Sequence, residues 1–237
     1  MKKYFVEDIN VAKAIKDAEE FLKNNNFVNI QGEKGCGKKS VAEHIAVKKN
    51  LNFVKIDCNN KKEFDEKIAI ENVELLMFYN IQSLNIQQVE DIIAVLSQKE
   101  KKIVLINYSD IITKDHKFNE LQKNNKIMLP ALKERSDLYD MFCYFVEEFY
   151  QIQTVETSVI EILPNVKTII ENTIDWSKED LTIGTLEDIA AVCVLLCGHN
   201  PCIDANNNIF PRPDKCNSFQ LQYLKKSGNI LRRGLYK

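Results

Sequence analysis

One segment of the chain combines residue types and spacing that could bind phosphate groups. It matches the first seven positions of the phosphate-loop pattern G-x-x-x-x-G-K. Its residues are Gly32, Glu33, Lys34, Gly35, Cys36, Gly37 and Lys38. Such glycines let backbone N–H groups surround an anion, and the lysine reaches the outer phosphates. The next position, which normally carries a Mg²⁺-binding hydroxyl, is Lys39, and Ser40 follows it. A glycine-rich turn with an incidental lysine is the simpler alternative.

The segments around this loop are those that a phosphate site requires, a strand before it and a helix after it. Residues 27–30 are a short apolar run, and apolar side chains recur with helical spacing over 39–48. The same reasoning predicts further helices at 9–23, 61–70 and 86–98 and further strands at 52–57, 73–79 and 102–107. Strands that alternate with helices predict an α/β fold, a parallel sheet flanked by helices.

The pattern changes in the second half of the chain. A short strand is predicted at 127–129, and helical patterns then dominate at 136–150, 157–172 and 185–197. We therefore expect three parts: an α/β core in 1–132, a small all-helical lid subdomain in 133–200, and a loop-rich basic tail in 201–237.

Composition argues against a membrane or secreted protein. There is no apolar run long enough to span a bilayer, and the N-terminus lacks the apolar stretch of a signal peptide. Seven cysteines, an odd number, fit a reducing compartment better than a disulfide framework. The 32 Lys and Arg balance 34 Asp and Glu, so no bulk basic charge indicates nucleic-acid binding. We expect a soluble cytoplasmic protein.

Several segments together resemble the AAA+ domain of sigma-54 activators, the NtrC-like family. Residues 28–38 resemble the family's Walker A segment, which also lacks Ser or Thr after the lysine. Residues 53–58 are similar to its F-V-x-I-N-C strand, and 129–138 to the L-P-P-L-R-E-R segment that joins core and lid. Residues 186–196 are similar to the lid helix. The resemblance implies a P-loop AAA+ core and lid. It also implies that ATP or ADP is held by loop residues 32–38, by Lys39 and Ser40 after them, and by Asn107 at the sensor I position.

Four elements that this family uses for hydrolysis or coupling have no counterpart here. Tyr79 and Asn80 align with the Asp–Glu pair of Walker B, and the sigma-54-binding loop is missing between the second and third strands. No arginine lies in 108–128, where the arginine fingers are expected, and Gly184 or Thr185 aligns with the sensor II arginine. The arginines of the chain are Arg135, Arg212, Arg232 and Arg233.

These losses favour a pseudo-ATPase that binds ATP or ADP weakly. Its Mg²⁺ side lacks the usual ligands, and no catalytic residues are expected. We expect a bacterial regulatory module that senses nucleotide or binds another protein, from the transcription or signalling machinery. The alternative is a divergent active ATPase of the sigma-54 activator type. Without an arginine finger to complete a neighbour's site, a monomer or dimer is expected rather than a hexamer, and no membrane partner.

Other candidate sites have ordinary structural alternatives. Cys193, Cys197, His199 and Cys202, with Cys216, have a spacing that could bind zinc, or the cysteines are simply buried. Cys36 could be a redox-sensitive thiol or just replace the family's threonine. Asp57 could hold a metal together with Asp110 or Asp115.

The tail has no acidic residue after Asp214 and carries six positive charges in 215–237. Parts of it resemble the helix-turn-helix that ends many sigma-54 activators, although the segment is short for that module. It is either a solvated basic tail or an arm that contacts DNA phosphates, which would make the protein a DNA-associated regulator.

Overall fold

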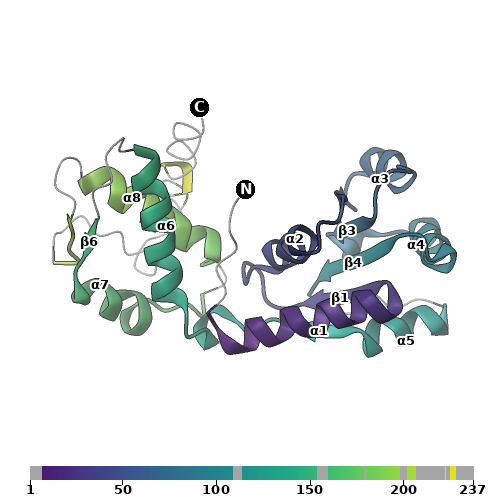
Figure 1. Ribbon diagram of the computed structural model, residues 1–237, viewed down its shortest axis with the longest axis horizontal. Helices are drawn as coiled ribbons and strands as arrows, with labels where there is room; N and C mark the ends of the chain where they lie inside the picture. Colours follow the sequence, from purple (N-terminus) through teal and green to yellow (C-terminus); the bar gives the residue numbers. More distant parts are fainter. Residues whose placement is uncertain are drawn as a thin grey trace. The chain divides into compact units, whose positions relative to one another are not determined.

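The computed structural model describes residues 7–108, 114–153, 160–178, 180–197, 202–206, 222 and 225–227. The chain divides into two compact units, Met1–Pro130 and Ala131–Lys237, which are considered separately (Figure 1). None of the described helices has the length and apolar character needed to cross a bilayer. The predicted three-part division, with its separate tail, stays a prediction.

The first unit is built on a parallel sheet. Its strands are β1 (Phe27–Gln31), β2 (Phe53–Asp57), β3 (Leu75–Tyr79), β4 (Lys102–Asn107) and β5 (Lys126–Met128). Within the described residues they form one sheet in the order β2-β3-β4-β1-β5. The register pairs Gln31 with Asn107 and Asp57 with Tyr79, so these residues end their strands at one edge. In parallel sheets that edge is where ligands bind.

Helices connect the strands and cover both faces of the sheet (Figure 1). They are α1 (Ile9–Asn25), α2 (Lys38–Lys48), α3 (Lys61–Ile68), α4 (Ile86–Gln98) and α5 (His116–Asn124). Neighbouring side chains of a strand point to opposite faces, so each face buries its own apolar set. Val28 and Ile30 pack in the cluster that includes α1 and α2 residues. Phe27 meets Phe118 of α5 on the other face, with ring centroids 6.1 Å apart. The predicted α/β fold is confirmed.

The helix α5 has no counterpart among the predicted elements. Its sequence, His116–Asn124, is polar except for Phe118 and Leu121, so only two apolar side chains indicate the helix. Asp115 begins it by accepting a 2.8 Å hydrogen bond from the backbone N–H of Phe118. The helix therefore depends on a cap and on one deeply buried ring rather than on a continuous apolar stripe.

The second unit is mainly helical. Its elements are η2 (Leu132–Glu134), α6 (Leu138–Gln153), β6 (Glu161–Ile162), α7 (Pro164–Thr168), the π-helical turn η3 (Ile169–Thr173), α8 (Ile183–Cys197) and β7 (Cys202–Ile203). The strands β6 and β7 pair in parallel.

The predicted single helix at 157–172 is wrong. Leu163, directly before Pro164, is extended, with φ −72° and ψ 150°, and helix begins only at the proline. Proline disfavours helical backbone in the residue before it and is well suited to the first turn of a helix. Residues 161–162 are accordingly a strand. The apolar periodicity of the segment concealed this break.

A buried ion pair stands at the start of the second unit. Arg135 donates to Asp137 twice, from Nε to Oδ1 at 2.8 Å and from Nη2 to Oδ2 at 2.7 Å. Both side chains are almost completely excluded from solvent, at 0% and 1% exposure. Such a pair holds the chain in one local geometry because neither charge tolerates burial alone.

We predict that Asp137→Ala lowers the free energy of unfolding by about 3–5 kcal/mol, because it leaves the Arg135 guanidinium buried without its carboxylate. The double variant Arg135→Met/Asp137→Leu removes both charges and should lose much less. Urea unfolding followed by circular dichroism measures both. The control is Glu66→Ala, which breaks the exposed Lys62–Glu66 pair and should change stability by about 0–1 kcal/mol. Equal losses in the single and double variants would contradict the role of the buried charge.

Candidate phosphate-binding site

The loop between β1 and α2 has the backbone geometry of a phosphate-binding turn. Gly32, Gly35 and Gly37 have φ values of 151°, 80° and 98°, which residues other than glycine rarely adopt. At Gly32 space is also lacking: an added Cβ would lie 2.8 Å from Cys36 Sγ and 3.1 Å from the Leu129 carbonyl oxygen. The glycines of the motif are therefore required by the backbone of this loop.

The first turn of α2 differs from the other helix starts of the first unit. Asp8, Asn60, Asn85 and Asp115 each accept a hydrogen bond from a backbone N–H in the first turn of α1, α3, α4 and α5, respectively. The N-cap residue of α2 is Gly37, which offers no side-chain acceptor. The N-terminus of a helix carries partial positive charge and unpaired N–H groups, so an uncapped start suits an anion.

Lys38 lies inside the loop. Its side chain is buried, and its Nζ donates to the carbonyl oxygens of Gly32 at 2.7 Å and Glu33 at 2.6 Å. Nζ also lies 4.3 Å from the ring centroid of Tyr108, directly after β4. Burial lowers the pKa of Lys38 below 10.5, and the nearby Cys36 and Glu33 oppose this effect. The ammonium is thus held against the backbone of the loop, beside the Tyr108 ring.

Lys39 contacts the end of β3. Its Nζ lies 3.4 Å from the ring centroid of Tyr79, the last residue of that strand, in a cation–π contact. The Lys39 side chain is largely exposed; the partial burial of its ammonium lowers its pKa, while Asp57 raises it. Burial, together with the charges of Asp57 and Glu63, raises the pKa of Tyr79. Tyr79 is therefore a neutral phenol at physiological pH.

The residues at the predicted Mg²⁺ positions do not match the ion. Mg²⁺ takes oxygen ligands at about 2.0–2.1 Å in near-octahedral geometry, with carboxylates prominent among them. Here Lys39 supplies an ammonium and Tyr79 a neutral phenol. The Asn80 amide nitrogen Nδ2 donates a 2.8 Å hydrogen bond to Asp57 Oδ1. The Lys39 ammonium therefore occupies the position at which the phosphate-loop pattern has a Mg²⁺-binding hydroxyl.

Asn107 lies buried at the carboxyl end of β4, in register with the residue before Gly32. Its Nδ2 donates to Asn29 Oδ1 at 2.9 Å, and Asn29 Nδ2 donates to the Gln122 carbonyl oxygen at 3.3 Å. Within the described ranges its buried Oδ1 finds no hydrogen-bond partner. This polar chain orients Asn107 at the edge that carries the loop, and sequence reasoning missed its Asn29 and Gln122 members.

The structure places the remaining predicted site residues with less specific contacts. Glu33 and Lys34 are exposed on the loop, Ser40 is half-buried in α2, and Cys36 is buried against Gly32. Burial of Cys36 favours its role as a packing residue over that of a redox-sensitive thiol. Tyr108 is a site residue that sequence reasoning missed; its only signal was an aromatic side chain directly after a strand.

The alternative metal sites gain no support from the described residues. In that part of the chain no group of three His, Cys, Asp or Glu side chains comes together. Asp115 serves as the cap of α5, and Asp110 lies outside the described residues. Cys193 is a buried thiol and Cys202 a half-buried one. The side chain of Cys197, and all of His199 and Cys216, lie outside the described residues, as does most of the basic tail.

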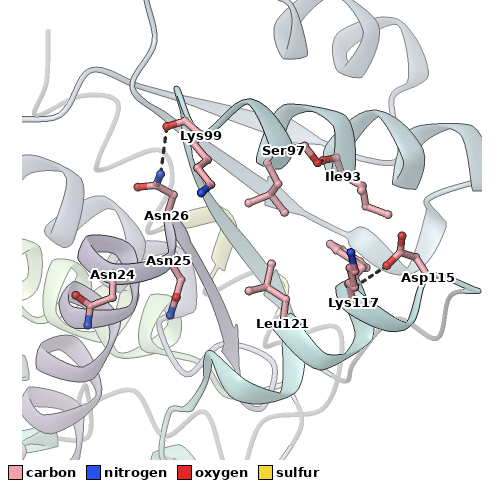
Figure 2. A pocket seen from close by; sticks show the side chains of 11 residues that line it. Asn24, Asn25, Asn26, Ile93, Ser97, Lys99, Asp115, Lys117 and Leu121 are labelled. Carbon is pink, nitrogen blue, oxygen red and sulfur yellow. Dashed lines mark hydrogen bonds between the residues drawn. The ribbon is translucent and has the colours of Figure 1, made fainter.

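A pocket of about 610 Å³ lies elsewhere in the first unit, between α4 and α5 (Figure 2). Asn24, Asn25 and Asn26 line it where β1 begins, and Lys99 lines it before β4. Asn26 Nδ2 donates to the Lys99 carbonyl oxygen at 3.2 Å at its rim. The phosphate loop follows the other end of β1, so this pocket is not part of the phosphate site.

Comparison with known protein families identifies the family of the chain. Residues 10–136 match the family model of Novel STAND NTPase 3, nSTAND3, and these residues make up more than half of the chain. The chain belongs to the nSTAND3 family. No curated protein matches it. The matched range of this nSTAND3 chain includes every strand of the sheet, the phosphate loop and both lysine–tyrosine contacts.

Solved structures support the same fold. NtrX from Brucella abortus in complex with ATP is similar at 13% identity and a TM-score of 0.66, over 98% of this chain and 61% of NtrX. NtrX in complex with ADP is similar at 14% identity and 0.67, over 97% and 65%. Domain III of the Thermotoga maritima replication initiation protein DnaA is similar at 15% and 0.53, over 98% and 95%.

The nSTAND3 chain thus spans about three fifths of the NtrX chains that it resembles. At these identities the likeness concerns the fold. The predicted P-loop AAA+ fold is confirmed.

We predict that Gly32→Ala lowers the free energy of unfolding by about 1–3 kcal/mol, because its φ is strained for alanine and its Cβ would crowd Cys36 Sγ and the Leu129 carbonyl oxygen. The control is Gly184→Ala in α8, where the added Cβ meets only Thr182 Oγ1, at 3.4 Å. A helical glycine replaced by alanine should gain up to about 1 kcal/mol. Urea unfolding compares the two variants; equal stability would contradict the strained geometry of the loop.

Proposed function

We propose that this nSTAND3 chain binds a nucleoside di- or triphosphate at the loop of residues 32–40 without hydrolysing it, and serves as a nucleotide-sensing regulatory module. One observation carries the proposal: a loop that matches the first seven positions of the phosphate-loop pattern is followed by Lys39, which contacts Tyr79 at the end of β3, and Tyr79 and Asn80 stand where the resemblance expects two acids. The first feature supports binding, and the second argues against turnover.

Support for binding comes from three properties of the loop. The glycines adopt the required positive φ values, the start of α2 is uncapped, and the Lys38 ammonium lies within the loop. The NtrX structures, which share the fold, were determined with ATP and with ADP. A nucleotide of this type is therefore the ligand we propose for this chain.

Support for the absence of hydrolysis comes from the chemistry at the strand ends. Hydrolysis of a phosphoanhydride needs a group that orients water and positive charge that stabilises the transition state. Tyr79 is a neutral phenol, and the Asn80 amide donates to Asp57. Neither residue can act as a carboxylate base toward water.

A protein that binds nucleotide without turnover acts only through the conformations that the nucleotide favours. We therefore propose a protein partner that reads the bound state, from the transcription or signalling machinery of a bacterial cytoplasm. The chain would act as a monomer or dimer, because no arginine finger is expected to complete a neighbouring site.

Thermal unfolding with ADP and ATP tests binding. At a nucleotide concentration about ten times the dissociation constant, binding adds about 1.4 kcal/mol and raises Tm by about 3–5 °C. Lys38→Met should abolish the rise. Lys48→Met, a matched change in the same helix at an exposed lysine that pairs with the half-buried Glu19, should keep it. A wild-type chain whose Tm does not respond to saturating nucleotide would refute the proposal.

Release of inorganic phosphate tests turnover. We expect the wild-type chain to release no more phosphate from ATP than Lys38→Met does, measured with malachite green. Phosphate release that depends on Lys38 would instead establish the divergent active ATPase. The Lys48→Met control again distinguishes an effect of the loop from a general effect on the helix.

Nucleotide affinity should fall at alkaline pH. Burial lowers the pKa of Lys38 in the free chain below 10.5, and bound phosphates would raise it again. Binding is then coupled to proton uptake, so the dissociation constant rises as the pH passes the lowered pKa, by at most about tenfold per pH unit. Lys38→Arg is the control, because its guanidinium stays charged throughout this range. A nucleotide dissociation constant that does not change with pH would show that Lys38 does not contact the phosphates.

A further inference from the structure

We propose that the Lys39 ammonium takes the place of Mg²⁺, so that the chain binds its nucleotide without a divalent cation. The inference rests on the proposed nucleotide binding and specifies how the phosphate charge is neutralised. P-loop proteins commonly bind Mg²⁺ at the start of the helix after the loop, but Lys39 and Tyr79 at those positions are not its usual ligands.

Neither of the two residues at the expected ion positions is a usual ligand of Mg²⁺. Lys39 follows Lys38 in the first turn of α2, where the pattern places the hydroxyl ligand. Tyr79 ends β3, where the resemblance places the first acid of Walker B. Their side chains contact each other, with Nζ 3.4 Å from the ring centroid. A hydroxyl and a carboxylate that bridge through a metal are thus replaced by an ammonium and a ring that bind directly.

The contact also determines where the positive charge lies. The face of an aromatic ring attracts a cation through its quadrupole, so Tyr79 holds Nζ at the carboxyl edge of the sheet. Asp57, which pairs with Tyr79 in the sheet register, adds a negative charge that favours the ammonium. A phosphate group at the start of α2 would add another. Lys38 and Lys39 together would then place two positive charges at the phosphates.

Among the described residues, positions 39 and 79 supply no carboxylate or aliphatic hydroxyl for Mg²⁺. A dication between residues 39 and 79 would lie beside the ammonium of Lys39, which has the same sign. Asp57, the acid that pairs with Tyr79 in the sheet, already accepts at Oδ1 hydrogen bonds from Asn80 Nδ2 at 2.8 Å and from the Asn59 N–H at 3.0 Å. One ammonium has half the charge of Mg²⁺, which is consistent with weak binding.

The test is titration of a fluorescent ADP analogue with the full chain, in excess MgCl₂ and in excess EDTA. We expect dissociation constants that agree within about threefold for the wild-type chain. Lys39→Met should weaken binding about tenfold in both buffers, because it removes the charge and keeps the length of the side chain. Lys48→Met, with the same change at the far end of α2, should bind as the wild type does.

The double variant Lys39→Ser/Tyr79→Asp restores a hydroxyl and a carboxylate. We expect its binding to become Mg²⁺-dependent, at least about tenfold tighter in MgCl₂ than in EDTA. If the double variant folds and its affinity does not depend on Mg²⁺, positions 39 and 79 do not correspond to Mg²⁺-ligand positions, and the inference is overturned. If it does not fold, as judged by its thermal unfolding, the Lys39→Met comparison decides alone.

The wild-type titration separates the two proposals. Binding that weakens at least about tenfold in EDTA overturns the replacement of Mg²⁺ by Lys39 and leaves nucleotide binding standing. Unchanged affinity of Lys39→Met in EDTA overturns it as well. No binding in either buffer overturns the proposed function, and this inference with it.

Discussion

The close contact between Gly32 and the chain at Leu129 is the constraint on which the candidate site depends. The Leu129 N–H donates to the Gln31 carbonyl oxygen at 2.8 Å, which extends the pairing of β1 with β5 to the last residue of β1. The chain must leave the sheet at once, at a residue with no side chain. From that point the positions of Gly35, Gly37 and the first turn of α2 follow, because the turn has few other backbone solutions.

The sheet order then determines which side chains meet the loop. Because β4 lies between β1 and β3, Tyr108, which directly follows β4, lies beside Lys38, and Tyr79 of β3 lies one strand farther out. Lys38 meets Tyr108, which follows β4, and Lys39 meets Tyr79, which ends β3. The distribution of aromatic contacts therefore follows directly from strand order, and residues nearly seventy positions apart form one site.

Much of this could be predicted from the sequence. The apolar run before Gly32, the glycines and the helical spacing after Lys39 are local patterns, and they determined the fold and the loop. The contact between Lys39 and Tyr79 was not predictable, although both residues had been placed at the metal position, because it depends on the spacing of strands and a rotamer. The helix α5 was missed because it has only two apolar side chains, and Pro164 interrupted a periodic segment that looked continuous. Local patterns show where elements form, whereas contacts between distant elements need the packed structure.

The two hydrogen bonds of Lys38 have a consequence for the energetics of any ligand. Its ammonium already donates to the carbonyl oxygens of Gly32 and Glu33. An incoming phosphate would not meet a solvated lysine but would exchange with these two acceptors. The enthalpy gained is then the difference between bonds to phosphate and bonds to carbonyl, which is smaller than the full strength of either. In return the side chain is ordered before the ligand arrives, so little rotamer entropy is lost on association. The affinity of the loop thus reflects an exchange between acceptors within a preorganised frame.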